Sequence, residues 1–438
     1  MEMVGKTSEP KIAQKESMKD TIYNKTALKN GIRVITERIS HVRSVSLGVF
    51  VTSGARDESR EENGISHMIE HMVFKGTEKR TAKDIAMSLE SVGGHLDAFT
   101  SKEETCFFAR VLDEHVPLAV DVISDIATRS LFAEKDLEKE KKVVLEEIKG
   151  VEDSPDDLVH DILGAALFDG HPLGQTVLGP PGNCKRWTSE KLKSFWMGHY
   201  LTPSVIVAAA GSVEHSDLVK LAGRAYEFPK GEPGSKNGPL PETPPRSRIR
   251  RKKITQAHLT LGCRTFPFTD PRRFALLIFS TILGGGMSSK LFQTVREREG
   301  LAYAVFSYTD FFQDTGMFGI YLGVDPQKVL EALRLVLREV GTFPKEGISE
   351  QDLENAKQQI KGNMMLGLES TSNRMMRLAR MEMTIGKYVT LDETLSEIDG
   401  VTREEVLAVA REFIDPRHLS LAAVGPLREG KIDLGELL

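Results

Sequence analysis

Residues 45–52, VSLGVFVT, are rich in β-branched and apolar side chains, which predicts a buried strand. The core of this strand, Ser46-Leu47-Gly48, returns 214 positions later as Thr260-Leu261-Gly262. Three further matches follow in the same order and at nearly the same offset: Asp136-Leu137-Glu138 with Asp352-Leu353-Glu354, Thr188-Ser189-Glu190 with Thr402-Arg403-Glu404, and TPSVIVAAAGSV from Thr202 with DPRHLSLAAVGPL from Asp415. Ordered matches at one offset predict an internal duplication.

The two similar halves are separated by residues 228–245, FPKGEPGSKNGPLPETPP, where six prolines exclude a helix or a central strand. We therefore expect a first domain at residues 21–228, a linker at 229–250 and a second domain at 251–438. Residues 1–20 are polar and are expected to form a flexible extension.

Each half mixes strands and helices without strict βαβ alternation, which favours an α+β fold. We expect two duplicated domains, each a mostly antiparallel sheet packed with several helices. In the first half, strands are predicted at 45–52, 104–111 (after the Gly93-Gly94 turn) and 204–209, and helices at 64–74, 82–91 and 134–149.

The bulk composition excludes several kinds of partner. The net charge of -5 over 438 residues argues against nucleic acid. No apolar run is long enough to span a membrane. The three cysteines form no CxxC pair, which fits a reducing compartment. The first twenty residues carry acidic side chains and no apolar core of a signal peptide, so a cytoplasmic location is expected.

The segment His67-Met68-Ile69-Glu70-His71 carries the chemistry. In a helix, positions i and i+4 share a face, so His67 and His71 can present two imidazoles to one ion with Glu70 alongside. This is the inverse of the HExxH zinc helix. Zinc would lower the pKa of a bound water, and Glu70 would accept its proton. The alternative is that two histidines simply lie on a half-buried helix face.

A third ligand is expected from a carboxylate of the predicted helix at 134–149. Glu140 and Glu147 are two turns apart on one face, and Glu146 is rotated by about 100° from Glu147. Periodicity alone leaves a metal ligand and a solvated acidic face equally open.

The chain resembles the pitrilysin/insulinase family of zinc metallopeptidases (inverzincins), in particular its mitochondrial-processing-peptidase-like bacterial branch. The resemblance runs from about residue 23 to 425 and is carried by ENGISHMIEHMVFKGT, SVGGHLDAFTSKEETCF, EKEKKVVLEEI and ILGGGMSSKLFQTVREREGLAYAV. It implies one Zn²⁺ per chain, held by His67, His71 and Glu147, with Glu70 as the base and Glu140 supporting the site.

The same resemblance implies substrate contacts. Phe74 matches a pocket aromatic, and Ala98 and Phe99 lie in the strand that follows Gly93-Gly94, to which the family pairs extended substrates. Asp97 stands where family members often have Asn, and the added carboxylate is expected to affect pH dependence or preference for charged substrates.

In the second half, Arg296 and Tyr303 match the family's substrate-binding pair, which helps to polarise the scissile carbonyl. Glu147 corresponds there to Asn363 or Gln359, so no second metal site is expected. The resemblance implies an endopeptidase that cleaves peptides or unfolded segments in a chamber formed by a homodimer, with this pair acting on the partner's zinc. The alternatives are a non-catalytic scaffold subunit and one half of a heterodimeric processing peptidase.

Overall fold

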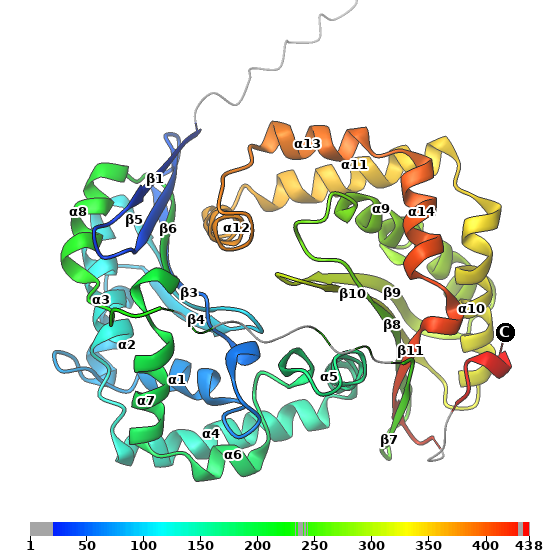
Figure 1. Cartoon of the computed structure of the whole chain (residues 1–438), viewed down its shortest axis with the longest axis horizontal. Coiled ribbons are helices and arrows are strands. Elements are labelled where there is room, and N and C mark those ends of the chain that lie inside the picture. The colour runs from blue at the N-terminus through cyan, green and yellow to red at the C-terminus, as the bar shows by residue number, and fades with distance from the viewer. Residues whose placement is uncertain are drawn as a thin grey trace, which may run out of the picture.

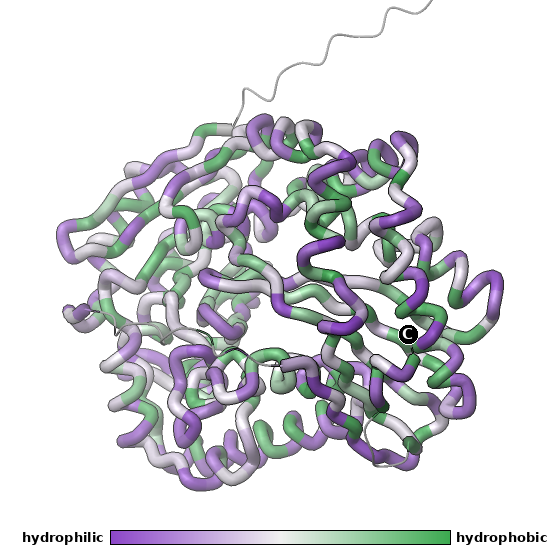
Figure 2. Tube along the Cα trace, turned by 45° about the vertical axis from the view of Figure 1, so that its right-hand side comes forward, coloured by the Kyte–Doolittle hydropathy of each residue, from purple (hydrophilic) through white to green (hydrophobic). Residues whose placement is uncertain are grey.

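The computed structural model describes residues 21–232, 234, 240, 242, 244–427 and 432–437. The extension predicted at 1–20 lies outside the described residues, as does part of the predicted linker. Two sheets, each covered by helices, lie side by side (Figure 1). Apolar stretches run through the interior, and hydrophilic residues are frequent on the outer helices (Figure 2). The α+β architecture of two similar halves is therefore confirmed.

The first sheet has six strands in the order β1-β2-β6-β3-β5-β4. Its pairs are antiparallel except β2 with β6, which run parallel. The strands are β1 (Thr21–Ala27), β2 (Arg33–Ile39), β3 (Ser44–Val51), β4 (His95–Thr100), β5 (Thr105–Leu112) and β6 (Val205–Gly211). The helices of this half are α1 (Ile65–Val73), α2 (Ala82–Glu90), α3 (Val116–Thr128), α4 (Glu134–Asp153), α5 (Pro155–Leu167), α6 (Pro181–Arg186), α7 (Ser189–His199) and α8 (His215–Ala225).

The second sheet has five strands in the order β7-β11-β8-β10-β9 and repeats the pairing of the first, with β7 and β11 parallel and the other pairs antiparallel. The strands are β7 (Ser247–Arg251), β8 (Ala257–Thr265), β9 (Ala302–Phe311), β10 (Gly316–Val324) and β11 (Ser420–Gly425). The helices are α9 (Arg273–Gly284), a π-helix (Phe292–Arg298), α10 (Val329–Glu346), α11 (Glu350–Gly367), α12 (Thr371–Thr384), α13 (Leu391–Gly400) and α14 (Arg403–Phe413). Strands β3 and β8 carry the repeated segments recognised in the sequence.

The residue pattern of the first half did not predict three of its strands, β1, β2 and β4. The segment predicted as a strand after Gly93-Gly94 is β5, but β4 comes directly after those glycines and lies at the free edge of the sheet. Strand β4 is six residues long and each of its positions is exposed or half-buried, so it has no fully buried face that would mark it as a strand. The edge expected to receive an extended substrate is therefore β4.

The two halves exchange a helix. Helix α5, from the first half, packs Leu158, Val159 and Leu163 against Tyr321 and Val424 of the second sheet. Helix α12, from the second half, occupies the equivalent place on the first sheet, where its buried residues contact β2, β3 and β6 (Figure 1). Each half is thus completed by a helix of the other, and the two sheets are held in one body.

Among the described helices, none combines the length with the apolar composition that crossing a bilayer requires.

Candidate metal centre

Helix α1 holds the two histidines in place by burying its opposite face. Met68, Ile69 and Met72 are completely buried in the core of the first half. His67 and His71 are therefore turned away from that core on the other side of the helix, where α4 passes.

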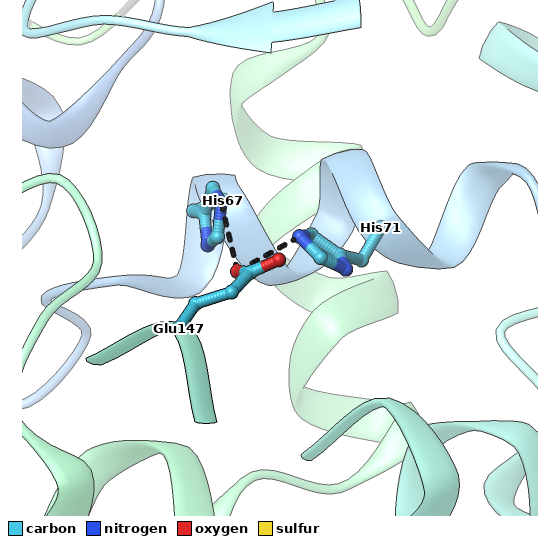
Figure 3. A group of neighbouring side chains, drawn as sticks. All are labelled: His67, His71 and Glu147. Carbon is cyan, nitrogen blue, oxygen red and sulfur yellow. Dashed lines mark ion pairs between the residues drawn. The ribbon is translucent and has the colours of Figure 1, made fainter. Parts of the chain in front are cut away.

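Glu147, from α4, completes a cluster of three potential ligands. Its Oε2 lies 3.8 Å from Nε2 of His67 and 3.4 Å from Nε2 of His71. The ligand atoms of the three residues lie within 4.8 Å of one another (Figure 3). Glu146, which the helical period rotates by about 100° from Glu147, pairs with Lys149 on the exposed face. Within the described part of the chain this is the one such cluster, and it lies in the first half.

The residues present fit a zinc ion. Burial, and then the nearby His71, lower the pKa of His67 to about 4, so its imidazole is neutral and free to coordinate. Oε2 of Glu147 is buried yet accepts no hydrogen bond from any described residue, which suits an oxygen that faces a cation. Two imidazoles and one carboxylate are the donor set of catalytic zinc sites, which keep a fourth position for water or substrate.

Glu140 contacts the cluster from outside the three ligands and orients the ring of His71. Its Oε2 lies 3.2 Å from Nδ1 of His71, and its Oε1 lies 2.8 Å from Nζ of Lys75. The Glu140 side chain is buried, so this pairing is well protected from solvent. Glu140 therefore contacts a histidine rather than the ligand position itself, the usual place of a carboxylate that fixes the ring of a metal-binding histidine.

Glu70 lies on the same helix and has a carboxylate suited to proton transfer. Burial raises the pKa of Glu70, and the negative charge of Asp97 adds to this, while a 2.6 Å hydrogen bond from Thr100 Oγ1 to Oε2 acts in the opposite direction. Thr100 lies in β4 and was not foreseen. Its two-residue spacing from Ala98, which the resemblance had placed in a strand, was the signal that could have put it on the face towards α1.

The predicted substrate residues lie around this cluster in different settings. Phe74 ends α1 and packs partly buried against the first-half core. Ala98 packs against the same core, whereas Phe99 points to the opposite face of β4 and lies beside Phe108 and the exchanged helix α12. Ala98 and Phe99 therefore lie on opposite faces of the free edge strand.

Arg296 and Tyr303 lie near each other in the second half. The Arg296 guanidinium lies 5.6 Å from the centre of the Tyr303 ring, which is 74% exposed. No hydrogen bond, ion pair or ring contact between described residues joins either of them to the metal cluster within the chain. The structure brings the pair together and leaves Tyr303 open to solvent.

A cavity of about 670 Å³ lies between the two halves and is separate from the cluster. Its lining includes Lys102 and Asp161 of the first half and Asp310 of the second. His67, His71 and Glu147 do not line it. The metal cluster is therefore presented beside the edge of the sheet rather than inside this cavity.

Comparison with known proteins places these features in a family. A family model described as insulinase (peptidase family M16) matches residues 33–181, and one described as peptidase M16 inactive domain matches residues 186–360. An uncharacterised zinc protease of Streptomyces coelicolor is 40% identical over 92% of this chain and 90% of its own length.

Two further relatives extend the comparison. A probable mitochondrial-processing peptidase subunit beta of Arabidopsis thaliana is 33% identical over 92% of this chain and 78% of its own length. A solved structure, titled as a peptidase M16 inactive domain of Pseudomonas fluorescens, superposes with a TM-score of 0.86 at 21% identity and covers 93% of this chain and 99% of its own. The likeness to the solved structure shows the fold alone.

Proposed function

The chain belongs to the insulinase family, peptidase family M16, and on that premise we propose that it is a zinc-dependent endopeptidase acting on peptides or unfolded polypeptide segments. The observation that carries the proposal is the convergence of His67, His71 and Glu147 from two helices, with the Glu70 carboxylate on the same helix as the histidines.

His67, His71 and Glu147 would hold the ion, which when bound supplies a positive charge that lowers the pKa of water and polarises a carbonyl. Glu70 accepts the proton of the attacking water. Its Oε2 already accepts the hydrogen bond from Thr100, so Oε1 is the atom left to take that proton and return it to the leaving amine. Burial makes the Glu70 carboxylate more basic than a solvated one.

The substrate strand would add to β4. This strand is the free edge of the first sheet, and among the described residues no strand pairs with the backbone groups on its outer side. Pairing to an edge recognises any extended chain through its backbone, so selectivity for sequence should be modest. Unstructured peptides are accordingly better substrates than folded domains.

We further propose a homodimer in which Arg296 and Tyr303 of one chain face the metal centre of the other. The support is indirect: the pair lies in the half without the ligand cluster, and Tyr303 is solvent-exposed in the isolated chain. In the long single-chain members of the family four such domains form the chamber, so the resemblance implies that a chain of two needs a second copy.

Two rival functions remain within the family. A non-catalytic core subunit would be expected to lack ligands, whereas this chain keeps both histidines, Glu70 and Glu147. One half of a heterodimeric processing peptidase would obtain its Arg/Tyr pair from a sister chain, whereas this chain carries Arg296 and Tyr303 itself. Both observations favour a self-sufficient enzyme.

The proposal is tested by measuring zinc content, molecular mass in solution and cleavage of an unstructured peptide. We expect about one zinc per chain and cleavage that a chelator stops. Glu70→Gln should keep the metal and lower the cleavage rate by at least about 100-fold, because it removes only the base. His71→Ala should lose both metal and cleavage. Wild-type protein that folds without binding zinc, or Glu70→Gln at full rate, would contradict the proposal.

A further inference from the structure

Glu58 is a buried carboxylate at the beginning of the metal-binding helix. Its side chain is 2% exposed and lies between the short 3₁₀ turn Ala55–Asp57 and helix α1. Oε2 accepts hydrogen bonds from the backbone N–H of Gly64 at 2.7 Å and from Nδ2 of Asn63 at 3.0 Å. Oε1 accepts one from the backbone N–H of Ser66 at 2.8 Å.

These bonds replace a cap that α1 cannot make for itself. The first N–H groups of a helix have no partner inside the helix, and a side chain at the N-cap normally accepts from them. The N-cap residue of α1 is Gly64, which has no side chain to do so. Gly64 cannot be replaced by a capping residue, since its φ is +96° and an added Cβ would lie 2.4 Å from the carbonyl oxygen of Leu178.

The carboxylate itself is fixed from several sides. Asn63, which donates to Glu58, also donates to the carbonyl oxygen of Thr176 at 2.7 Å. The side chain of Gln175 reaches the carbonyl oxygen of Glu58 at 3.3 Å. These hydrogen bonds hold the segment around Glu58 against the loop at Gln175 and Thr176. The segment can therefore fix the position of the first turn of the helix.

Fixing the first turn of α1 fixes the ligands. Ser66, whose N–H bonds Glu58, directly precedes His67, and Glu70 and His71 follow within about one further turn. Small shifts or rotations of a helix move its side chains off a metal-binding geometry that tolerates only about 0.5 Å. Burial raises the pKa of Glu58, and the hydrogen bonds from Gly64, Ser66 and Asn63 oppose this. The positive end of the helix dipole, which the carboxylate faces, also favours its ionised form.

We propose that Glu58 is a positioning residue. It fixes the position of α1 along its axis and its rotation about that axis, so that His67 and His71 face Glu147. The inference rests on the proposed zinc site and deepens it by adding a residue nine positions before His67. Glu58 is not among the ligands, the base or the supporting carboxylate that the family resemblance implies. Glu58 touches neither substrate nor metal and acts through the helix.

The test compares Glu58→Gln with the matched control Glu62→Gln. Glutamine has the same shape but only one acceptor oxygen, so it cannot serve both Gly64 and Ser66. Glu62 lies in the same segment but bonds Lys191 and the backbone of Ser59. The measurements are the zinc dissociation constant by chelator competition, the visible spectrum of the Co²⁺-substituted protein, and the melting temperature of the metal-free protein.

We expect Glu58→Gln to weaken zinc binding by about 10-fold or more and to change the Co²⁺ spectrum, as removal of supporting partners does at metal sites. Glu62→Gln should match the wild type in both. Glu58→Gln with wild-type zinc affinity and an unchanged Co²⁺ spectrum would overturn the inference, even if the metal-free protein melted earlier.

If Glu58→Gln does not fold, Glu58→Asp decides the question, since it keeps the charge but is too short to reach both N–H groups. Wild-type zinc affinity in Glu58→Asp would then refute the positioning role. Because the deciding measurement is metal affinity, the result is separate from the peptidase proposal. A wild-type protein that binds zinc but cleaves no peptide would refute the peptidase and leave the role of Glu58 to be judged on its own.

Discussion

Oε2 of Glu140 lies 3.2 Å from Nδ1 of His71, and the opposite ring nitrogen, Nε2, faces Glu147. A carboxylate at Nδ1 holds the proton on that nitrogen and leaves the lone pair of Nε2 for a metal. The pairing thus selects the tautomer that the proposed site requires. It also connects two carboxylates of one helix to one imidazole: Glu147 as a potential ligand and Glu140 as the group that orients the ring.

Replacing this orienting carboxylate should weaken the site without removing a ligand. For Glu140→Gln we expect zinc affinity to fall by about 10- to 100-fold, because the ring of His71 loses its ionic partner. Competition with a chelator measures the change. Glu138→Gln is the matched control, since Glu138 lies on the exposed side of the same helix and pairs with Lys141. Equal affinities for the two variants would refute the role of Glu140.

The hydroxyl of Thr100 should set the acidic limb of the pH profile. Its hydrogen bond favours the ionised form of Glu70 and therefore lowers the pKa of this residue against the effect of burial. In Thr100→Val the pKa of Glu70 rises, so the base is ionised only at higher pH. The acidic limb of kcat/KM should move to higher pH, whereas Thr100→Ser, which keeps the hydroxyl, should leave it near the wild-type position.

Removing the charge of Asp97 should shift the acidic limb of the kcat/KM pH profile in the direction opposite to that expected for Thr100→Val. Its negative charge raises the pKa of Glu70. Asp97→Asn removes this charge, so the pKa of Glu70 falls and the acidic limb of kcat/KM should move to lower pH. The side chain of Asp97 is 57% exposed, so salt should screen its effect. The shift should be largest at low ionic strength, and a limb that moves to higher pH would contradict the assignment.

The buried pair of Glu37 and Arg374 should be essential for holding the exchanged helix α12 on the first sheet. The Glu37 side chain is only 2% exposed and pairs with Arg374 of α12. Arg374→Met leaves that carboxylate buried without its partner, at an expected cost of about 3–5 kcal/mol. Chemical unfolding should show a clear fall in the midpoint.

Two further variants test this reading. The double variant Glu37→Gln/Arg374→Met should recover part of the loss, since it no longer buries an unpaired charge. Arg38→Met is the control, because Arg38 and its partner Glu214 are both exposed and such pairs contribute about 1 kcal/mol or less. A similar midpoint for Arg374→Met and Arg38→Met would show that the buried pair does not hold the helix.

Much of this protein could be predicted from local patterns. The repeat offset predicted two similar halves, and the structure repeats the strand pairing from β2-β6-β3-β5-β4 to β7-β11-β8-β10-β9. The helical period placed His67 and His71 on one face, because side chains four positions apart in a helix necessarily lie together. The period could not choose between a metal ligand and a solvated carboxylate, and the family resemblance was needed to assign Glu147.

What the sequence by itself determined was therefore the duplication, the fold class and the face of α1 that carries the imidazoles, since all three follow from spacing along the chain. The tertiary structure alone decided which groups meet. It brings Thr100 to Glu70, Glu140 to His71 and Glu58 to the first turn of α1. It also places α5 on the second sheet and α12 on the first. The physical reason is that an apolar helix face specifies burial but not the sheet that buries it. The partner is chosen only when both halves pack together.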